Sequence, residues 1–196
     1  MHHGQMAGFS TKTFAKFDDY MTPKECWENI KDIIPKDKII WEPFFGDGRS
    51  GEYLTELGFN VIHRDEDFFE NNNGDIIVSN PPFSIKKEIL TRLKELNKPF
   101  ILIMPCSVLN TKYIRELFSN NLQIIIPKKR IQFDKLINGE RIKLNACNFD
   151  CFYYCYKIGL DRDINFQECL KKKEEIIEKP KLIIKKKLII RKTQEK

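Results

Sequence analysis

The sequence predicts an α/β fold in which helices cover both faces of a mostly parallel sheet. Short apolar runs typical of buried strands alternate along the chain with segments whose apolar residues have helical spacing. Polar or glycine-rich residues directly follow several of these runs, as they do where the strands of such a sheet end. The 196 residues are enough for one domain with its own core.

The first half of the chain contains three expected strands and one expected helix. Residues 38–41 are a short apolar run that leads into a glycine turn, and residues 50–57 follow with the spacing of a helix. Gly58 suits the end of that helix. Residues 60–63 and 75–79 are apolar again, and we expect them to be the next two strands.

The second half continues the alternation. Residues 84–96 carry apolar side chains along one side of a helix, and residues 112–118 predict a shorter helix. Apolar runs predict strands at residues 100–104, 122–126 and 149–158, of which the last is rich in aromatic residues. This alternation indicates parallel strands, with room for an antiparallel strand at the end.

The turn after the first strand reads Glu-Pro-Phe-Phe-Gly-Asp-Gly over residues 42–48. Gly46 and Gly48 permit a tight turn and a close approach of the backbone to a ligand. The spacing matches neither the dinucleotide-binding G-x-G-x-x-G motif nor a phosphate-binding P-loop, which ends in G-K-[ST]. We therefore expect a ligand site of another kind.

The most informative motif is Asn-Pro-Pro-Phe at residues 80–83, directly after the third expected strand. Two consecutive prolines lack N–H groups and cannot continue a central strand. The Asn80 side-chain amide and nearby carbonyl groups are then left to face a ligand beside an aromatic ring. An ordinary strand-to-loop turn would also explain the prolines. However, Glu42, Asp65 and Asn80 all follow strands, where parallel sheets bind ligands.

Three segments occur in order along the chain: Tyr-Met-Thr-Pro at residues 20–23, the glycine turn, and Asn-Pro-Pro-Phe. Together they resemble the class I S-adenosylmethionine-dependent methyltransferases that modify the N6 amino group of adenine. Over residues 18–160 the chain is similar to small DNA adenine methyltransferases of phages and large viruses. The resemblance implies a Rossmann-like class I methyltransferase fold, S-adenosyl-L-methionine as cofactor and DNA as substrate.

The resemblance also implies which residues contact the cofactor. They are Tyr20, Thr22, Pro23, Glu42, Pro43, Phe44, Gly46, Gly48, Asp65, Asp67, Phe68 and Asn80. The glycine turn would pass beneath the methionine part of the cofactor, with Glu42 near its ammonium group. Asp65 would accept the ribose hydroxyl groups, and Asp67 and Phe68 would contact the adenine.

Simpler interpretations of some of these residues stay open. Asp65 and Asp67 lie in a segment crowded with acidic residues, as a solvated turn would. Thr22 and Pro23 are also typical of a helix start, with Thr as the cap and Pro in the first turn. Both interpretations of the helix start can hold at once.

The expected catalytic residues are Asn80, Pro81, Pro82 and Phe83. An exocyclic amine is a poor nucleophile because its lone pair is delocalised into the purine ring. The Asn80 oxygen and the Pro81 carbonyl could accept hydrogen bonds from the two N–H groups of this amine and favour a tetrahedral nitrogen. Phe83 would stack on a base that has left the duplex. Phe133 or Tyr153 could cover the other face, although each is more typical of a core.

Charge indicates where nucleic acid would bind. The net charge is +6, and residues 171–196 contain eleven Lys or Arg and four Glu. The residues expected to contact nucleic acid are Lys128, Lys129, Arg130, Arg141 and Lys143. Residues 130–148 are the candidate target-reading loop, within a catalytic domain of residues 18–160. An arm (residues 1–17) precedes this domain and a basic tail (161–196) follows it.

Other acceptors and partners stay open. The same chemistry could act on RNA adenine or on a protein glutamine amide, and a catalytically silent nucleic-acid-binding subunit is a third interpretation. The apolar stretches 182–184 and 188–190 suit a small ribbon or a dimer contact, so a homodimer or a partner subunit is considered.

The six cysteines predict buried, reduced thiols, and no metal is expected. Cys147, Cys151 and Cys155 do not have the spacing of zinc ligands. The sequence contains no signal-peptide pattern and no apolar stretch of membrane-spanning length. We expect an intracellular protein, cytoplasmic or nuclear, that has no membrane partner.

Overall fold

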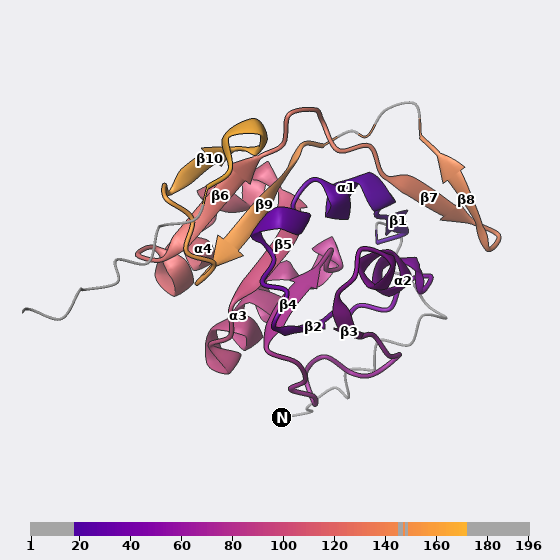
Figure 1. Cartoon of the computed structure of the whole chain (residues 1–196), viewed down its shortest axis with the longest axis horizontal. Coiled ribbons are helices and arrows are strands. Elements are labelled where there is room, and N and C mark those ends of the chain that lie inside the picture. Colours follow the sequence, from indigo (N-terminus) through magenta and orange to yellow (C-terminus); the bar gives the residue numbers. More distant parts are fainter. Residues whose placement is uncertain (1–17, 145–146, 148, 172–196) are drawn as a thin grey trace, which may run out of the picture.

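The computed structural model of the chain describes residues 18–144, 147 and 149–171, and a mixed sheet is at its centre (Figure 1). This sheet has seven strands among the described residues, and their spatial order is β10 (Ile164–Phe166), β6 (Leu122–Ile126), β9 (Cys151–Tyr156), β5 (Phe100–Pro105), β4 (Ile76–Ser79), β2 (Ile39–Trp41) and β3 (Asn60–Ile62). Among these strands, β9 runs antiparallel to β5 and β6, and the other pairs are parallel. The predicted mostly parallel α/β sheet is confirmed.

Helices cover both faces of this sheet, as predicted for a Rossmann-like fold. One face packs against α1 (Lys24–Glu28), the short 3-10 helix η1 (Lys31–Ile33) and α2 (Arg49–Glu56). The other face packs against α3 (Lys86–Leu96) and α4 (Lys112–Phe118). Within the described part of the chain, no helix has the length and apolar character needed to cross a membrane.

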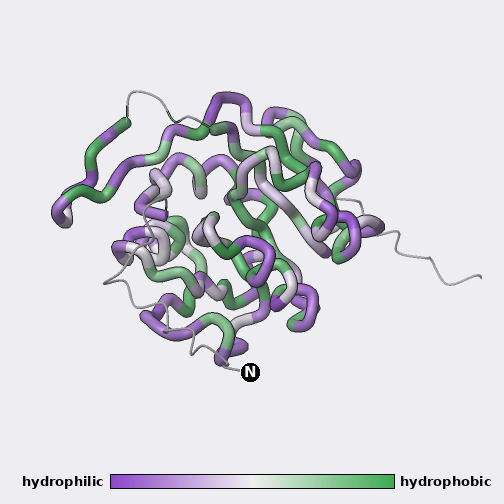
Figure 2. The backbone as a smooth tube through the Cα atoms, turned by 180° about the vertical axis from the view of Figure 1, so that it is seen from behind, coloured by the Kyte–Doolittle hydropathy of each residue, from purple (hydrophilic) through white to green (hydrophobic). Residues whose placement is uncertain are grey.

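The alternation of side chains along each strand separates two cores. In β4, Ile76 and Val78 face the core of α1 and α2, whereas Ile77 faces the core of α3 and α4. Both faces of the central strands are therefore apolar, which explains why they read as continuous hydrophobic runs. Figure 2 shows these strands as hydrophobic tubes within a more hydrophilic periphery.

The antiparallel strand lies inside the sheet and not at its edge. Tyr153 and Tyr154 of β9 point to opposite cores and are fully buried, so this strand needs cover on both faces. The edge strand beside β6 is β10, which lies in the segment expected as a basic tail. The sheet therefore continues past residue 160. The arm at 1–17 and residues 172–196, including the apolar stretches of the tail, lie outside the described residues.

A second, three-stranded antiparallel sheet is formed by β1 (Tyr20–Met21), β7 (Asp134–Ile137) and β8 (Glu140–Lys143). The segment expected as a target-reading loop thus contains a hairpin, which extends from the body of the molecule beside β1 and α2 (Figure 1). Its turn residues Asn138 and Gly139 have φ values of 52° and 84°. Asn-Gly is a strong hairpin signal, so the sequence did contain evidence for this turn.

The close packing of α2 on the end of β3 depends on a residue without a side chain. A Cβ atom at Gly51 would lie 2.3 Å from Cγ and Cδ2 of His63. The His63 ring is itself fixed, because it stacks on Phe45 with 4.7 Å between ring centroids. The helix that follows the glycine turn is therefore held directly against the strand end.

Gly51→Ala tests this packing. Alanine favours a helix over glycine by about 1 kcal/mol, so helix propensity alone would stabilise the variant. Because the methyl group collides with His63, we expect the free energy of unfolding to fall by about 1–3 kcal/mol, measured by urea denaturation. Ser50→Ala, in the same helical turn, is the control. A variant as stable as the native chain would contradict the close packing.

Candidate active site

The polar residues of the site lie at one edge of the sheet. The strands β4, β2 and β3 are neighbours and parallel, so their carboxyl ends meet there. Glu42 directly follows β2, His63 directly follows β3 and Asn80 directly follows β4. The expected convergence of Glu42 and Asn80 at one edge is therefore present.

Glu42 is a carboxylate buried at the base of the site, with 1% of its surface exposed. The Ser79 hydroxyl donates a hydrogen bond to Glu42 Oε1. His63 Nδ1 lies 2.5 Å from Glu42 Oε2 and 3.0 Å from the Glu42 carbonyl oxygen. Sequence analysis did not select Ser79 or His63, although each lies at the end of an expected strand, which was the available signal.

The His63 ring is polarised by Glu42. Burial acts to lower the His63 pKa, but the hydrogen bond and the negative charge of Glu42 outweigh burial and raise the pKa above its ordinary value of 6.5. The charged form of the imidazole is therefore favoured beneath the glycine turn.

The glycine turn combines left-handed backbone with buried flanks. Gly46 and Gly48 have φ values of 59° and 85°, and Gly48 is the N-cap of α2. Pro43 is buried, and the half-buried Phe44 ring packs on Phe68 at 5.0 Å between centroids. The backbone of this turn can thus approach a ligand closely, as expected from its glycines.

The segment before the first strand is fastened to the Asn-Pro-Pro-Phe motif. Asp18 Oδ1 accepts hydrogen bonds from the backbone N–H groups of Phe83, at 2.7 Å, and Ser84, at 3.2 Å. The Asn80 side-chain N–H donates to the Tyr20 carbonyl at 3.4 Å. Asp18 was not selected from the sequence, because its partners lie 65 and 66 positions away.

Four buried polar atoms of the site have no hydrogen-bond partner among the described residues. Two belong to the ion pair, Glu42 Oε2, which faces His63 Nδ1, and His63 Nε2. The other two, Asn80 Oδ1 and Thr22 Oγ1, have no ion-pair partner either. The helix α1 begins with Pro23 as its N-cap and without a side-chain cap bond, so Thr22 does not cap it. Since buried polar groups are normally hydrogen-bonded, both atoms are suited to a polar ligand.

Aromatic rings surround the same motif. Pro81 is buried, Pro82 is half-buried, and the half-buried Phe83 ring lies 5.6 Å from Phe149, centroid to centroid. Phe133 and Tyr153 are buried core residues, 1% and 0% exposed. Neither of these two is open to a base, in agreement with the core interpretation.

The acidic turn after β3 differs in part from expectation. Asp65 is exposed, and Asp67 Oδ1 accepts a hydrogen bond from the Phe69 N–H at 2.8 Å. Phe68 is only 3% exposed and packs against Trp41 and Phe44. The Phe68 ring therefore belongs to the core behind the glycine turn, where its apolar surface is removed from water, and does not present an open face to an adenine.

The basic residues fall into two groups. Lys128 and Lys129, just beyond β6, and Lys143 on β8 are exposed, whereas Arg130 Nε pairs with Asp150 at 2.5 Å. Arg141 is the residue that differs from expectation, because its side chain is only 8% exposed and pairs with Asp47. It is held inside the protein and does not lie open to nucleic acid. Residues 145, 146 and 148 of the candidate target-reading loop lie outside the described residues.

The Arg141 pair also changes the titration of its partner. Burial acts to raise the Asp47 pKa, but the hydrogen bonds and positive charge of Arg141 outweigh burial and hold that pKa below its ordinary value. Asp47 therefore remains a carboxylate at neutral pH.

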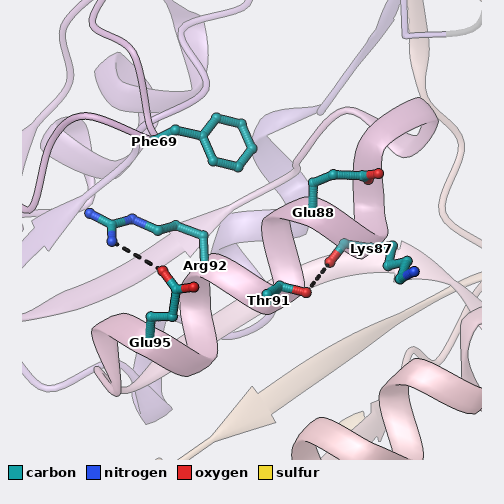
Figure 3. Close-up of a pocket in the computed structure, with 6 residues that line it drawn as sticks. All are labelled: Phe69, Lys87, Glu88, Thr91, Arg92 and Glu95. Atoms are coloured by element: carbon teal, nitrogen blue, oxygen red, sulfur yellow. Dashed lines mark hydrogen bonds and ion pairs between the residues drawn. The ribbon is translucent and has the colours of Figure 1, made fainter. Parts of the chain in front are cut away.

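A groove on α3 lies apart from these residues (Figure 3). It is lined by Phe69, Lys87, Glu88, Thr91, Arg92 and Glu95. Arg92 Nη1 lies 3.3 Å from Glu95 Oε2, and the Thr91 hydroxyl donates to the Lys87 carbonyl oxygen. The groove contains none of the expected site residues.

No protein-family model and no curated protein sequence matches this chain. Similar solved structures include a candidate RNA methyltransferase from Pyrococcus horikoshii, 17% identical, with a TM-score of 0.46 over 76% of this chain and 92% of that chain. The tRNA methyltransferase TrmI from Aquifex aeolicus is 13% identical, with a TM-score of 0.37 over 74% and 72%. A precorrin-6y C5,15-methyltransferase from Geobacter metallireducens is 10% identical, with a TM-score of 0.40 over 71% and 95%. At these values the likenesses do not decide what this chain binds or modifies.

The Glu42–His63 pair predicts a pH-dependent stability. Because the His63 pKa is higher in the folded chain than in the unfolded chain, the pair stabilises fully below about pH 6.5 and less as pH rises through the raised pKa. We expect the free energy of unfolding to fall across this window, and to fall less in His63→Gln. Urea denaturation at a series of pH values measures both slopes. Equal slopes in the two proteins would exclude this role of His63.

Proposed function

We propose that this protein is an S-adenosyl-L-methionine-dependent methyltransferase that methylates the N6 amino group of adenine in DNA. The observation that carries the proposal is the buried, unpartnered Asn80 Oδ1 at the end of β4, beside the half-buried Phe83 ring. An acceptor and an aromatic surface are what an amino-bearing base requires. The fold supports only the methyltransferase part of the proposal, since class I methyltransferases share a mostly parallel sheet with helices on both faces.

The cofactor is held by the glycine turn and the segment before β2. The left-handed turn at Gly46 and Gly48 brings backbone close to the ligand, and Thr22 Oγ1 offers an unsatisfied hydroxyl group. Glu42 lies at the end of β2, where Ser79 and His63 fix its orientation. We assign Asp65, which is exposed after β3, as the acceptor for the ribose hydroxyl groups. When bound, the cofactor supplies an activated methyl group on a sulfonium.

The protein's own residues position the acceptor. Asn80 Oδ1 and the Pro81 carbonyl oxygen accept hydrogen bonds from the two N–H groups of the adenine amine. This arrangement directs the nitrogen lone pair toward the methyl group. Phe83 packs on the base after it leaves the duplex. These contacts would hold the nitrogen in line with the methyl–sulfur bond of a bound cofactor, whose methyl transfer would leave S-adenosyl-L-homocysteine and release one proton from the nitrogen to solvent. Alignment is the main contribution, and it needs no side-chain nucleophile.

Asn80 variants test the acceptor role. We expect Asn80→Ala to lower kcat by about 10²–10³-fold, comparable to removal of a single preorganised hydrogen-bonding group elsewhere, while cofactor binding persists. Asn80→Asp keeps an acceptor oxygen and should lose less activity. The assay uses labelled S-adenosyl-L-methionine with duplex DNA, single-stranded DNA and RNA, followed by mass spectrometry of nucleoside digests. Asn120→Ala, an exposed asparagine, is the matched control.

Each outcome of that assay has a distinct meaning. N6-methyladenine in DNA that disappears in Asn80→Ala supports the proposal. Label in RNA alone would move the substrate to RNA. Cofactor binding without label in nucleic acid would point to a protein glutamine acceptor or to a silent partner subunit, and absence of cofactor binding would exclude a methyltransferase.

The exposed lysines beyond β6 are expected to bind the phosphate backbone. We expect Lys128→Gln with Lys129→Gln to raise KM for nucleic acid and to reduce the slope of log affinity against log salt by about 1–2, with cofactor affinity unchanged. The matched control is Lys36→Gln with Lys38→Gln, exposed lysines that precede β2 at the opposite edge of the sheet. Equal effects of the two double variants would show that only overall charge matters.

A further inference from the structure

Arg141 is the one residue of the β8 strand whose charged side chain turns inward. Its neighbours Ile142 and Lys143 are exposed, Ile142 by 44%. Arg141 Nε lies 2.5 Å from Asp47 Oδ2, and Nη2 lies 2.8 Å from Asp47 Oδ1. This is the paired geometry in which a guanidinium binds a carboxylate most strongly. It joins residues 94 positions apart.

The same guanidinium reaches two further segments. Arg141 Nη1 donates to the Thr22 carbonyl oxygen at 3.1 Å and lies 3.4 Å from Asp134 Oδ2. Its central carbon lies 5.6 Å from the centre of the Tyr53 ring on α2. One side chain thus connects the hairpin β7–β8 to the segment before β2, to the glycine turn and to the helix after it.

Backbone pairing leaves the hairpin and the cofactor segments little freedom to move separately. Met21 of β1 is paired with Asp134 of β7, and Met21 Sδ lies 3.5 Å from the position of a Cβ built on Gly46. The Arg141 guanidinium lies between the carboxylates of Asp47 and Asp134 and reduces their mutual repulsion across this junction. Arg141 therefore joins the glycine turn to the hairpin by ion pairs on both sides.

We propose that Arg141 is a positioning residue that couples the hairpin, as the nucleic-acid-reading element, to the cofactor-binding turn. Cofactor seated on the turn fixes Asp47, and Arg141 then fixes the hairpin in the orientation that receives nucleic acid. Because such coupling is reciprocal, nucleic acid on the hairpin tightens cofactor binding by the same factor. This coupling rests on the proposed function, but it is read from binding and needs no turnover.

The experiment is a thermodynamic cycle. Calorimetry measures the affinity of the 196-residue chain for S-adenosyl-L-homocysteine, alone and with a saturating adenine-containing duplex. We expect the duplex to raise the affinity for S-adenosyl-L-homocysteine about 5-fold or more in the native chain. In Arg141→Gln we expect the duplex to leave this affinity unchanged. Asp47→Asn should remove the same factor, and the double variant should remove no more than either single change. Lys143→Gln, on the same strand but exposed, should weaken duplex binding and keep the coupling.

A merely structural role of Arg141 would lower the melting temperature without changing the coupling factor, and an unchanged factor in folded Arg141→Gln would overturn the proposal. A factor of 1 in the native chain would overturn it as well. If Arg141→Gln does not fold, the same cycle is measured with Arg141→Lys, because lysine keeps the positive charge but cannot form the two parallel hydrogen bonds to Asp47. Native protein that methylates DNA without coupling would refute Arg141's role alone, whereas failure to bind cofactor would refute the proposed function.

Discussion

A single buried carboxylate organises the carboxyl edge of the sheet. Glu42 ends β2 and is held by Ser79 at the end of β4 and by His63 after β3. A buried charge is costly unless it is paired and hydrogen-bonded, so these strand ends must meet for the chain to fold. His63 in turn fits only because Gly51 leaves space in α2. The position of the glycine turn follows from this chain of contacts.

Long-range contacts then place the remaining parts of the site around that edge. Asp18 fastens the segment before β2 to the backbone of Phe83 and Ser84, and β1 pairs with β7 of the hairpin. The oxygens Asn80 Oδ1 and Thr22 Oγ1, which come from motifs far apart along the chain, are both buried without a hydrogen-bond partner among the described residues.

Much of the fold could be read from local patterns. The predicted strands at 38–41, 75–79 and 122–126 agree with β2, β4 and β6 to within one residue at each end, and the predicted helix at 112–118 coincides with α4. Periodicity is a property of neighbouring residues, so a single sequence can reveal it. The place of β9 within the sheet and the strand β10 could not be read in this way, because strand order depends on contacts between distant segments.

Local sequence patterns were sufficient to predict the α/β alternation, the order of the three motifs and the placement of Glu42 and Asn80 at strand ends. Which of the selected side chains are open to a ligand depends instead on packing between distant segments. Phe68 has an aromatic ring that could pack on a base, but this ring is buried in a core. Arg141 has a charge that could bind a phosphate, but its side chain pairs with Asp47. The type of a residue determines which ligands its side chain can bind. Whether that side chain is accessible depends on burial and pairing, which are set by residues distant in the sequence.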